Sequence, residues 1–448
     1  MSVSVKAMSD TVELLRALIR NACVNDGTPE SGQEIRSVET LRDFFGRSGT
    51  DYEALPGRTS TVYRIPGADP AAPALTLMGH LDVVPVNEAG WSTDPFAGTV
   101  SDGFVWGRGA VDMLNLTAAM AVVFKQYLDG DLPPLPGDLV FLAVADEEAG
   151  GALGARQLVE HRWDLVATDY LLTEIAYPPL RLDGEPAYPI SVGEKGPFWT
   201  ILRSSGRPGH GSVPYAADNA MEPLVGAMSA LFSAPSPVSI SDVWRAFVES
   251  AGFEEDLAVR LTDPDQVDAA IDEVAETSPR LAAYLHACTH LTVSPNVVRS
   301  GVKANVIPDS AEGEVDFRAL PGQGRGDIDD HIRKAVGAAA DRLEIVPVAD
   351  FEANASAVGS SLWDCIVDSI EAHTGSRRVV PTLMPATTDA RFFRARGVTA
   401  YGVGLFDEAM SFPDFLTMFH GHDERVSLPS VESTTSLISS ILSRWRTA

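Results

Sequence analysis

The chain has 448 residues, of which 45% are hydrophobic and 21% are charged, a composition typical of folded globular proteins and unlike that of disordered or fibrous chains. A chain of this length is too long to fold around one ordinary hydrophobic core, so we expect two or more domains. The 62 acidic residues outnumber the 34 Lys and Arg and give a net charge of -28 at pH 7. Because such a charge repels phosphate backbones and anionic lipid surfaces, nucleic acid is not an expected partner.

The N-terminal segment predicts an amphipathic helix rather than a signal sequence. Its apolar residues follow helical spacing at Val12, Leu14, Leu15, Leu18 and Ile19. No stretch of about 18 apolar residues occurs elsewhere, so no membrane span is expected. The three cysteines, Cys23, Cys288 and Cys365, form no Cys-x-x-Cys pair. They indicate reduced thiols and a cytoplasmic protein.

Residues 74–173 alternate between strand and helix patterns. Short apolar runs at 74–78, 139–145 and 169–173 predict buried strands, and residues 116–128 and 152–160 between them predict helices. This alternation indicates an α/β core.

The pattern changes near residue 191. Strands are predicted at 198–202, 305–308 and 312–318, with helices at 220–232 and within 256–287. After about residue 322 the α/β pattern returns, with helices at 328–342, 360–374 and 430–445 and a strand at 343–348. No internal repeat or low-complexity tract is present.

Histidines and carboxylates follow several predicted strands and predict a centre for two metal ions. Zinc binds imidazole nitrogen and carboxylate oxygen, and two zinc ions about 3.5–4 Å apart need a bridging ligand. We expect His80 and Glu174 to bind one ion, Glu148 and His422 the other, and Asp112 to bridge them. Zinc is the expected metal, although these ligand types also accept cobalt or manganese.

The position of these ligands along the chain predicts the domain organisation. Because His422 must meet His80 and Glu148, residues 1–190 and 322–448 are expected to form one discontinuous catalytic domain. Residues 191–321 would then be an inserted domain. The inference comes from the chemistry of the site rather than from periodicity.

Four ordered motifs resemble the zinc aminoacylase and carboxypeptidase family, which includes acetylornithine deacetylase, succinyl-diaminopimelate desuccinylase, glutamate carboxypeptidase and carboxypeptidase S. The motifs are His80-Leu81-Asp82-Val83-Val84-Pro85, Trp106-Gly107-Arg108-Gly109-Ala110-Val111-Asp112, Asp146-Glu147-Glu148 and Asn305-Val306-Ile307-Pro308. The match runs in order from about Leu75 to His422. It implies a mixed α/β sheet flanked by helices, like that of zinc exopeptidases, with an inserted α+β lid domain that forms a homodimer in some relatives.

The resemblance also implies roles for individual residues. Glu147 would be the general base, Asp82 would fix the tautomer of His80, and the peptide bond after Asp112 would be cis. The lid histidine, here His210, would stabilise the oxyanion and often comes from a partner subunit. The residues that would hold the substrate carboxylate are Asn305, Arg318 and Thr388.

The chain departs from the family pattern at two places. Many relatives have Asp-x-Lys-Gly at the bridging aspartate, whereas this chain has Asp112-Met113-Leu114-Asn115. Relatives often have glycine or serine before Thr-Asp, where this chain has Thr387. The long segment 239–298 and the motif at 419–425 resemble carboxypeptidase S and its fatty-acyl amino acid hydrolase relatives, which favours a roomy acyl pocket.

Simpler interpretations exist for each residue. Glu174 could be an ordinary strand-end carboxylate, His210 or Asn305 could close a turn, and Arg318 could be a surface charge. His420 competes with His422 for the metal, and the spacing favours His422.

The combined signals predict a metal-dependent hydrolase that cleaves the amide bond of an N-acyl amino acid. The first alternative is a dipeptidase or carboxypeptidase of the same family. A more distant alternative is a binding protein that has kept the fold without catalysis.

Overall fold

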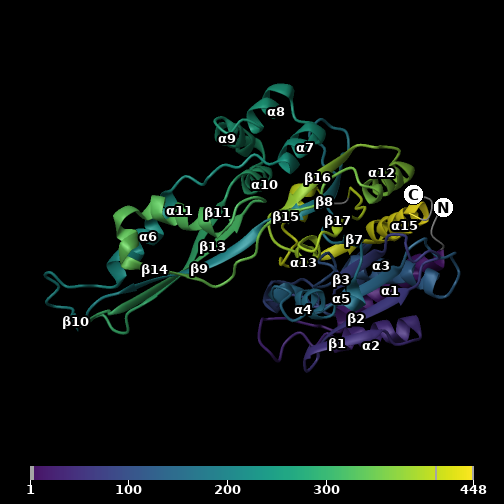
Figure 1. The fold of residues 1–448 in the computed structure, drawn as a ribbon, viewed down its shortest axis with the longest axis horizontal. Coiled ribbons are helices and arrows are strands. Elements are labelled where there is room, and N and C mark those ends of the chain that lie inside the picture. Colours follow the sequence, from purple (N-terminus) through teal and green to yellow (C-terminus); the bar gives the residue numbers. More distant parts are fainter. Residues whose placement is uncertain (1–4, 409–410, 446–448) are drawn as a thin grey trace.

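In the computed structural model, which describes residues 5–408 and 411–445, a nine-stranded mixed sheet forms the centre of the lobe that contains both termini (Figure 1). Eight strands follow the order β1-β2-β6-β3-β7-β17-β8-β15, and β16 also pairs with β8. They are β1 Thr50–Leu55, β2 Arg58–Ile65, β3 Leu75–His80, β6 Leu139–Val144, β7 Tyr170–Thr173, β8 Tyr188–Glu194, β15 Asn354–Ala355, β16 Val379–Met384 and β17 Thr399–Gly402.

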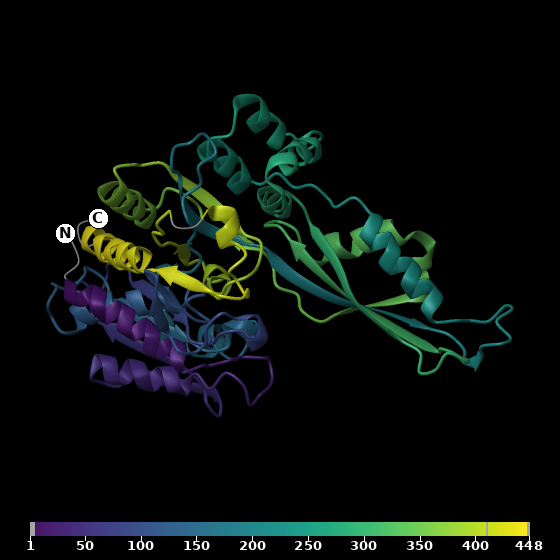
Figure 2. The ribbon, with the colours of Figure 1, turned by 180° about the vertical axis from the view of Figure 1, so that it is seen from behind.

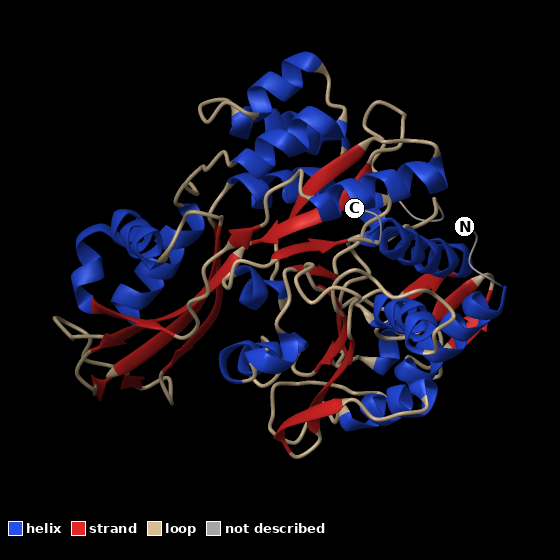
Figure 3. Ribbon diagram, turned by 45° about the vertical axis from the view of Figure 1, so that its right-hand side comes forward, coloured by secondary structure: helices blue, strands red, loops and turns tan. Residues whose placement is uncertain are grey.

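Helices cover both faces of this sheet, as expected when its strands are apolar on both sides (Figure 3). One face packs against α1 Val5–Arg20, α3 Leu114–Leu128, α12 Ser361–Thr374 and α15 Leu428–Trp445. The other packs against α4 Ala155–His161, α5 Trp163–Val166 and α13 Ala390–Arg394. Further elements of this lobe are α2 Ile35–Phe45, α14 Phe412–Phe415, the 3-10 turns at Glu88–Gly90 and Glu147–Ala149, and the small sheet β4 Thr99–Ser101, β5 Phe104–Trp106 and β18 Arg425–Ser427. The first and last parts of the chain therefore share one α/β domain.

An elongated lid projects from this domain (Figure 2). Its four-stranded antiparallel sheet has the order β11-β13-β9-β14, formed by β9 Gly196–Ser205, β11 Thr292–Ser300, β13 Ser310–Ala319 and β14 Leu343–Pro347. Buried and less buried residues alternate along β13, so only one face of the sheet is covered. The helices α6 Met221–Ser233 and α11 Arg325–Val336 pack on that face, and a 3-10 turn, Gly337–Arg342, leads into β14. A short pair, β10 Gly209–His210 and β12 Val306–Ile307, forms the tip.

The domain boundaries differ from those predicted by the sequence. The strand β8 belongs to the main sheet as far as Glu194, and the lid begins with β9. The sequence predicted that the second part of the catalytic domain begins at residue 322. In the structure it begins later, because β14 pairs with β9 and α11 contributes Ile328 and Ile332 to the lid core. The lid therefore continues to Pro347.

Four helices in the middle of the chain do not belong to the lid sheet. They are α7 Asp242–Ala251, α8 Glu255–Leu261, α9 Val267–Thr277 and α10 Pro279–Thr289. Their buried residues, among them Trp244, Phe247 and Leu285, join the core of the catalytic domain. Figure 1 shows this group beside β16, above the junction with the lid. Among the described residues, no helix is both long and apolar enough to cross a membrane.

Candidate metal centre

Three neighbouring parallel strands bring their carboxyl ends to one edge of the main sheet. The strand β3 lies between β6 and β7 and is parallel to both. His80 is the last residue of β3, Glu147 and Glu148 follow β6, and Glu174 follows β7. Because parallel strands end at the same edge, these residues, which are far apart in sequence, converge there.

His80 is almost completely buried, at 1% exposure, and its two ring nitrogens have different partners. Nδ1 lies 2.9 Å from the backbone oxygen of Asp82. Nε2 lies 3.3 Å from Asp112 Oδ1 and 3.7 Å from Glu174 Oε2. A proton on Nδ1 donated to this carbonyl leaves the Nε2 lone pair facing the two carboxylates, where a cation would bind.

The role expected for Asp82 requires correction. Its Oδ1 lies 3.6 Å from His80 Nδ1, so the backbone carbonyl rather than the carboxylate is the hydrogen-bond acceptor. The carboxylate instead accepts the backbone N–H groups of Glu147 and Glu148, at 3.2 and 3.1 Å, and the side-chain amide of Asn25 at 2.8 Å. Asp82 therefore positions the loop that carries both glutamates.

Asp112 belongs to two groups of potential ligands. One group is His80, Asp112 and Glu174, and the other is Asp112, Glu148 and His420. Within each group the ligand atoms lie within 4.8 Å of one another. Burial alone would raise the pKa of Asp112, but its contacts with the His420 and His80 imidazoles hold it well below its usual range. This geometry is the one that a bridging carboxylate requires.

The second histidine of the centre is His420, and the expectation for His422 is not supported. His420 Nε2 lies 3.3 Å from Glu148 Oε2 and 3.5 Å from Asp112 Oδ2. The exposed His422 ring instead lies against Gly90. His420 and Asp423 have positive φ values of 58° and 55°, so the chain turns sharply between them. This turn sends the two imidazoles in different directions, a result that their spacing alone does not reveal.

Glu147 lies beside the two ligand groups without belonging to either. Its Oε2 lies 4.0 Å from His80 Nε2. Burial, followed by the negative charge of Glu174, raises the pKa of Glu147 well above its usual value. Asp146 has a φ of 70°, a left-handed conformation that ends β6 and starts the 3-10 turn from Glu147 to Ala149. A carboxyl with a raised pKa at this position is suited to proton transfer.

Two buried acids near the centre were not predicted by the sequence. Glu424 accepts the backbone N–H groups of Gly109, Val111 and Asp112 at 3.0, 2.7 and 3.0 Å, and it pairs with Arg108 at 2.8 Å. It therefore fixes the loop that carries Asp112. The sequence could have indicated Glu424, because it stands in the same short motif as His420.

The second of these acids is Asp389. Within the described part of the chain, neither of its buried carboxylate oxygens has a hydrogen-bond partner. Burial raises the pKa of Asp389 to about 7, although Arg391 opposes this effect. Asp389 directly follows Thr388, one of the predicted substrate-binding residues.

The peptide bonds after two of the ligands are cis. Asp112-Met113 is cis, as the family resemblance implied, and Glu174-Ile175 is also cis, which no sequence feature predicted.

The residues expected to contact the substrate lie in three separate places. His210 and Asn305 are close together at the lid tip, where β10 pairs with β12 and Gly211 N–H donates to the Asn305 carbonyl at 2.8 Å. Figure 1 shows this tip at the end of the lid farthest from the catalytic sheet. Arg318 lies at the opposite end of the lid sheet and pairs with Asp316 at 2.8 Å. Thr388 is buried in the catalytic domain, where its N–H and hydroxyl both donate to Glu194.

The two ligand groups fit a pair of divalent cations. Buried carboxylates repel one another, and burial together with Asp112 raises the pKa of Glu148 to about 7. Glu148 Oε1 is buried and has no hydrogen-bond partner among the described residues. A cation would offset this repulsion and use the free acceptor. The donors are imidazole nitrogen and carboxylate oxygen, which suit zinc, cobalt and manganese.

Comparison with known proteins identifies the family. The sequence profile of peptidase family M20/M25/M40 matches residues 76–444. The chain belongs to this family. It is therefore an M20 family hydrolase, and the ligand groups lie within the matched region.

Curated M20 relatives resemble nearly the whole chain. Human N-fatty-acyl-amino acid synthase/hydrolase is 27% identical over 400 residues, which are 85% of this chain and 75% of that protein. Aminoacylase-1 from Mus musculus is 26% identical over 442 residues, 97% of this chain and 95% of that protein. Among solved structures, an M20 family metallo-carboxypeptidase from Sulfolobus solfataricus has a TM-score of 0.73 at 17% identity and covers 98% of this chain and 100% of its own. This last likeness shows the M20 fold, with its mixed sheet and lid.

Proposed function

We propose that this protein is a two-metal amidohydrolase that releases an amino acid from an N-acyl amino acid. The observation that carries the proposal is the position of Glu147, a buried carboxyl with a raised pKa beside two ligand groups that share Asp112. Aminoacylase-1 and the N-fatty-acyl-amino acid hydrolase are both relatives over most of the chain, which supports an acyl amino acid as the substrate.

Each residue near the centre has a distinct role in this proposal. His80, Glu174, Glu148 and His420 would hold two ions, proposed to be zinc, with Asp112 between them. Bound divalent ions polarise an amide carbonyl and make a nearby water more acidic. Glu147 would take the proton of the attacking water and then donate it to the leaving nitrogen. Asp82 and Glu424 hold the loops on which Glu147 and Asp112 lie.

The lid would complete the site. His210 would donate a hydrogen bond to the oxyanion, and Asn305 and Arg318 would bind the substrate carboxylate. His210 and Asn305 lie together at the exposed tip, so we propose that a second copy of the chain supplies them in a homodimer. Thr388 would act on the carboxylate through its loop, because its hydroxyl is already bonded to Glu194.

We propose a cytoplasmic location, supported by three free, buried cysteines and by the net charge of -28, which opposes contact with nucleic acid or anionic membranes.

The test is the release of free amino acid from a matched panel of substrates. The panel contains short-chain and long-chain N-acyl derivatives of one amino acid and dipeptides ending in the same residue. Each is assayed with added zinc and after chelation. Release from the acyl substrates that stops on chelation is the expected result. Release from dipeptides alone would assign the protein to the dipeptidases or carboxypeptidases. No release from any substrate would favour a binding protein.

A further inference from the structure

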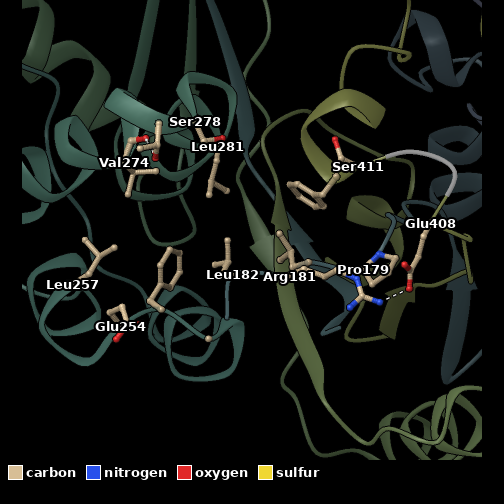
Figure 4. A pocket seen from close by; sticks show the side chains of 15 residues that line it. Pro179, Arg181, Leu182, Glu254, Leu257, Val274, Ser278, Leu281, Glu408 and Ser411 are labelled. Atoms are coloured by element: carbon tan, nitrogen blue, oxygen red, sulfur yellow. Dashed lines mark hydrogen bonds and ion pairs between the residues drawn. The ribbon is translucent and has the colours of Figure 1, made fainter. Parts of the chain in front are cut away.

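A cavity of about 540 Å³ lies outside the metal centre, and none of the candidate ligands lines it. One wall consists of the helices α8, α9 and α10, and the other of residues 179–182 together with Glu408, Ser411 and Phe412 (Figure 4). Its volume is within the range of small-molecule sites. We refer to it as the α8–α10 cavity.

The α8–α10 cavity has an apolar floor and a polar rim. Leu180, Val274, Leu281 and Phe412 line it and are buried. The exposed lining residues are mostly polar: Arg181, Glu254, Thr277, Glu408 and Ser411. Arg181 and Glu408, which lie in the same wall, form an ion pair at the rim, seen as a dashed line in Figure 4. Such a cavity favours a ligand with an apolar body and a polar end, since burying amides in it would leave them without partners.

Segments that line the α8–α10 cavity are connected, along the chain and by ring packing, to segments that carry candidate metal ligands. Pro179 in its wall is five residues after Glu174. The rings of Phe412 and Tyr177 pack with centroids 5.2 Å apart. The ring centroid of Tyr177 lies 6.4 Å from that of Phe419, which precedes His420 in the sequence. An occupant would therefore lie against the segments that carry one ligand from each group.

We propose that the α8–α10 cavity binds an unbranched aliphatic chain. Two sources have this chemistry. One is the acyl group of the substrate, whose carbonyl would stay at the metal centre, and this assignment rests on the proposed function. The other is a free fatty-acid-like amphiphile, whose polar end would lie at the rim near Arg181 and which does not depend on the proposed function. In both cases affinity should rise about fourfold for each methylene that enters the cavity.

The first experiment measures binding of butanoate, octanoate and dodecanoate to the full chain by calorimetry. Leu257→Trp fills the cavity from α8, whereas Val259→Trp, on the same helix, adds the same side chain at a position that is 60% exposed and outside the lining. We expect affinity to rise with chain length in the unmodified protein and in Val259→Trp, and dodecanoate binding to fall at least tenfold in Leu257→Trp. Absence of dodecanoate binding, or equal loss in both variants, would overturn the proposal.

A second pair of variants protects the test against misfolding. Thr277→Trp narrows the rim, and Glu276→Trp is its matched control beside it on α9. We expect dodecanoate affinity to fall in Thr277→Trp and to stay unchanged in Glu276→Trp. Equal affinities in these two variants would count against binding in the cavity.

Inhibition kinetics separate the two sources. Competition between dodecanoate and an N-dodecanoyl amino acid, together with loss of the preference for long chains in Leu257→Trp, assigns the cavity to the acyl group. Binding without competition assigns it to a separate amphiphile. If no N-acyl amino acid is hydrolysed, the proposed function fails, while the binding data still decide whether the cavity takes an aliphatic chain.

Discussion

At the residue scale, the choice between His420 and His422 determines whether the second ligand group is complete. Only His420 lies within reach of Asp112 and Glu148. We expect His420→Ala to lose one of two bound metal ions and most activity, and His422→Ala to keep both ions, because its ring lies against Gly90. Metal content after dialysis, measured by atomic absorption, checks this. Loss of an ion from His422→Ala alone would restore the original assignment.

Glu148 belongs to one of the two ligand groups, whereas its neighbour Glu147 lies outside both, and our proposal makes Glu147 the general base. We expect Glu147→Ala to lower kcat by about a thousandfold or more, since general acid–base catalysis contributes on this scale. Metal content should stay unchanged, and Glu160→Ala, an exposed glutamate on α4, should behave like the unmodified enzyme. Parallel assays of turnover and metal content check both points. A Glu147→Ala protein without metal would show that Glu147 is a ligand.

At the element scale, Lys195 ties the lid hinge to the helical group α7–α10. It is the single residue between β8 and β9, and its side chain is fully buried. Its Nζ donates to the carbonyls of Ala287 and His290 at 2.8 and 2.7 Å and to Thr292 Oγ1 at 3.0 Å. These carbonyls lie at the C-terminal end of α10, where helices leave their acceptors without partners. Lys195 therefore anchors α10 at the point where the lid leaves the main sheet.

We expect Lys195→Met to lower the free energy of unfolding by about 2 kcal/mol, because buried acceptors lose their donor. Burial lowers the pKa of Lys195 to about 7, from 10.5 in an unfolded chain. Between these values the unfolded chain binds a proton that the folded chain releases, so the stability that Lys195 contributes rises with pH. The cost of the substitution should therefore be larger near about pH 8.5 than at pH 7.

Urea unfolding of the Lys195→Met protein at both pH values measures this effect. Lys334→Met, on the exposed side of α11, is the control and should match the unmodified protein. A cost that shrinks as the pH rises would contradict the prediction.

At the scale of the whole molecule, the position of the lid tip argues for a site shared between two copies. His210 is exposed at the tip, far along the lid from the sheet edge that carries Glu147 (Figure 1). If one active site takes residues from two subunits, a variant that lacks one of these residues can be complemented by a variant that lacks the other.

We expect His210→Ala and Glu147→Ala to be nearly inactive alone and partly active after they are mixed and allowed to exchange subunits. In a mixed dimer one site has both residues, Glu147 from one chain and His210 from the other. Mixing Glu147→Ala with Glu147→Gln is the control and should restore nothing. Recovery by neither mixture, although sedimentation shows subunit exchange, would mean that His210 acts within its own chain.

Much of the fold followed from local pattern. The runs at 74–78, 139–145 and 169–173 became β3, β6 and β7, and the predicted helix at 116–128 became α3. The three strands are buried apolar runs and α3 is almost wholly buried, which are signals carried by neighbouring residues. The helix at 328–342 and the strand at 343–348 were also predicted, but they were assigned to the catalytic domain, whereas in the structure they belong to the lid. Pairing of β14 with β9 joins residues more than a hundred positions apart, and periodicity carries no information about such pairing.

The sequence by itself determined which residue types stand in which order, and therefore the chemistry of the centre and the family. Only the tertiary structure decided that His420 rather than His422 faces Asp112, that the Asp82 carboxylate holds the glutamate loop, and that the lid tip lies away from the metal centre. The physical reason is directional. A sharp backbone turn changes the direction of a side chain, and a projecting lid changes its distance from the metal centre. Neither changes the identity of the residue or its position in the sequence.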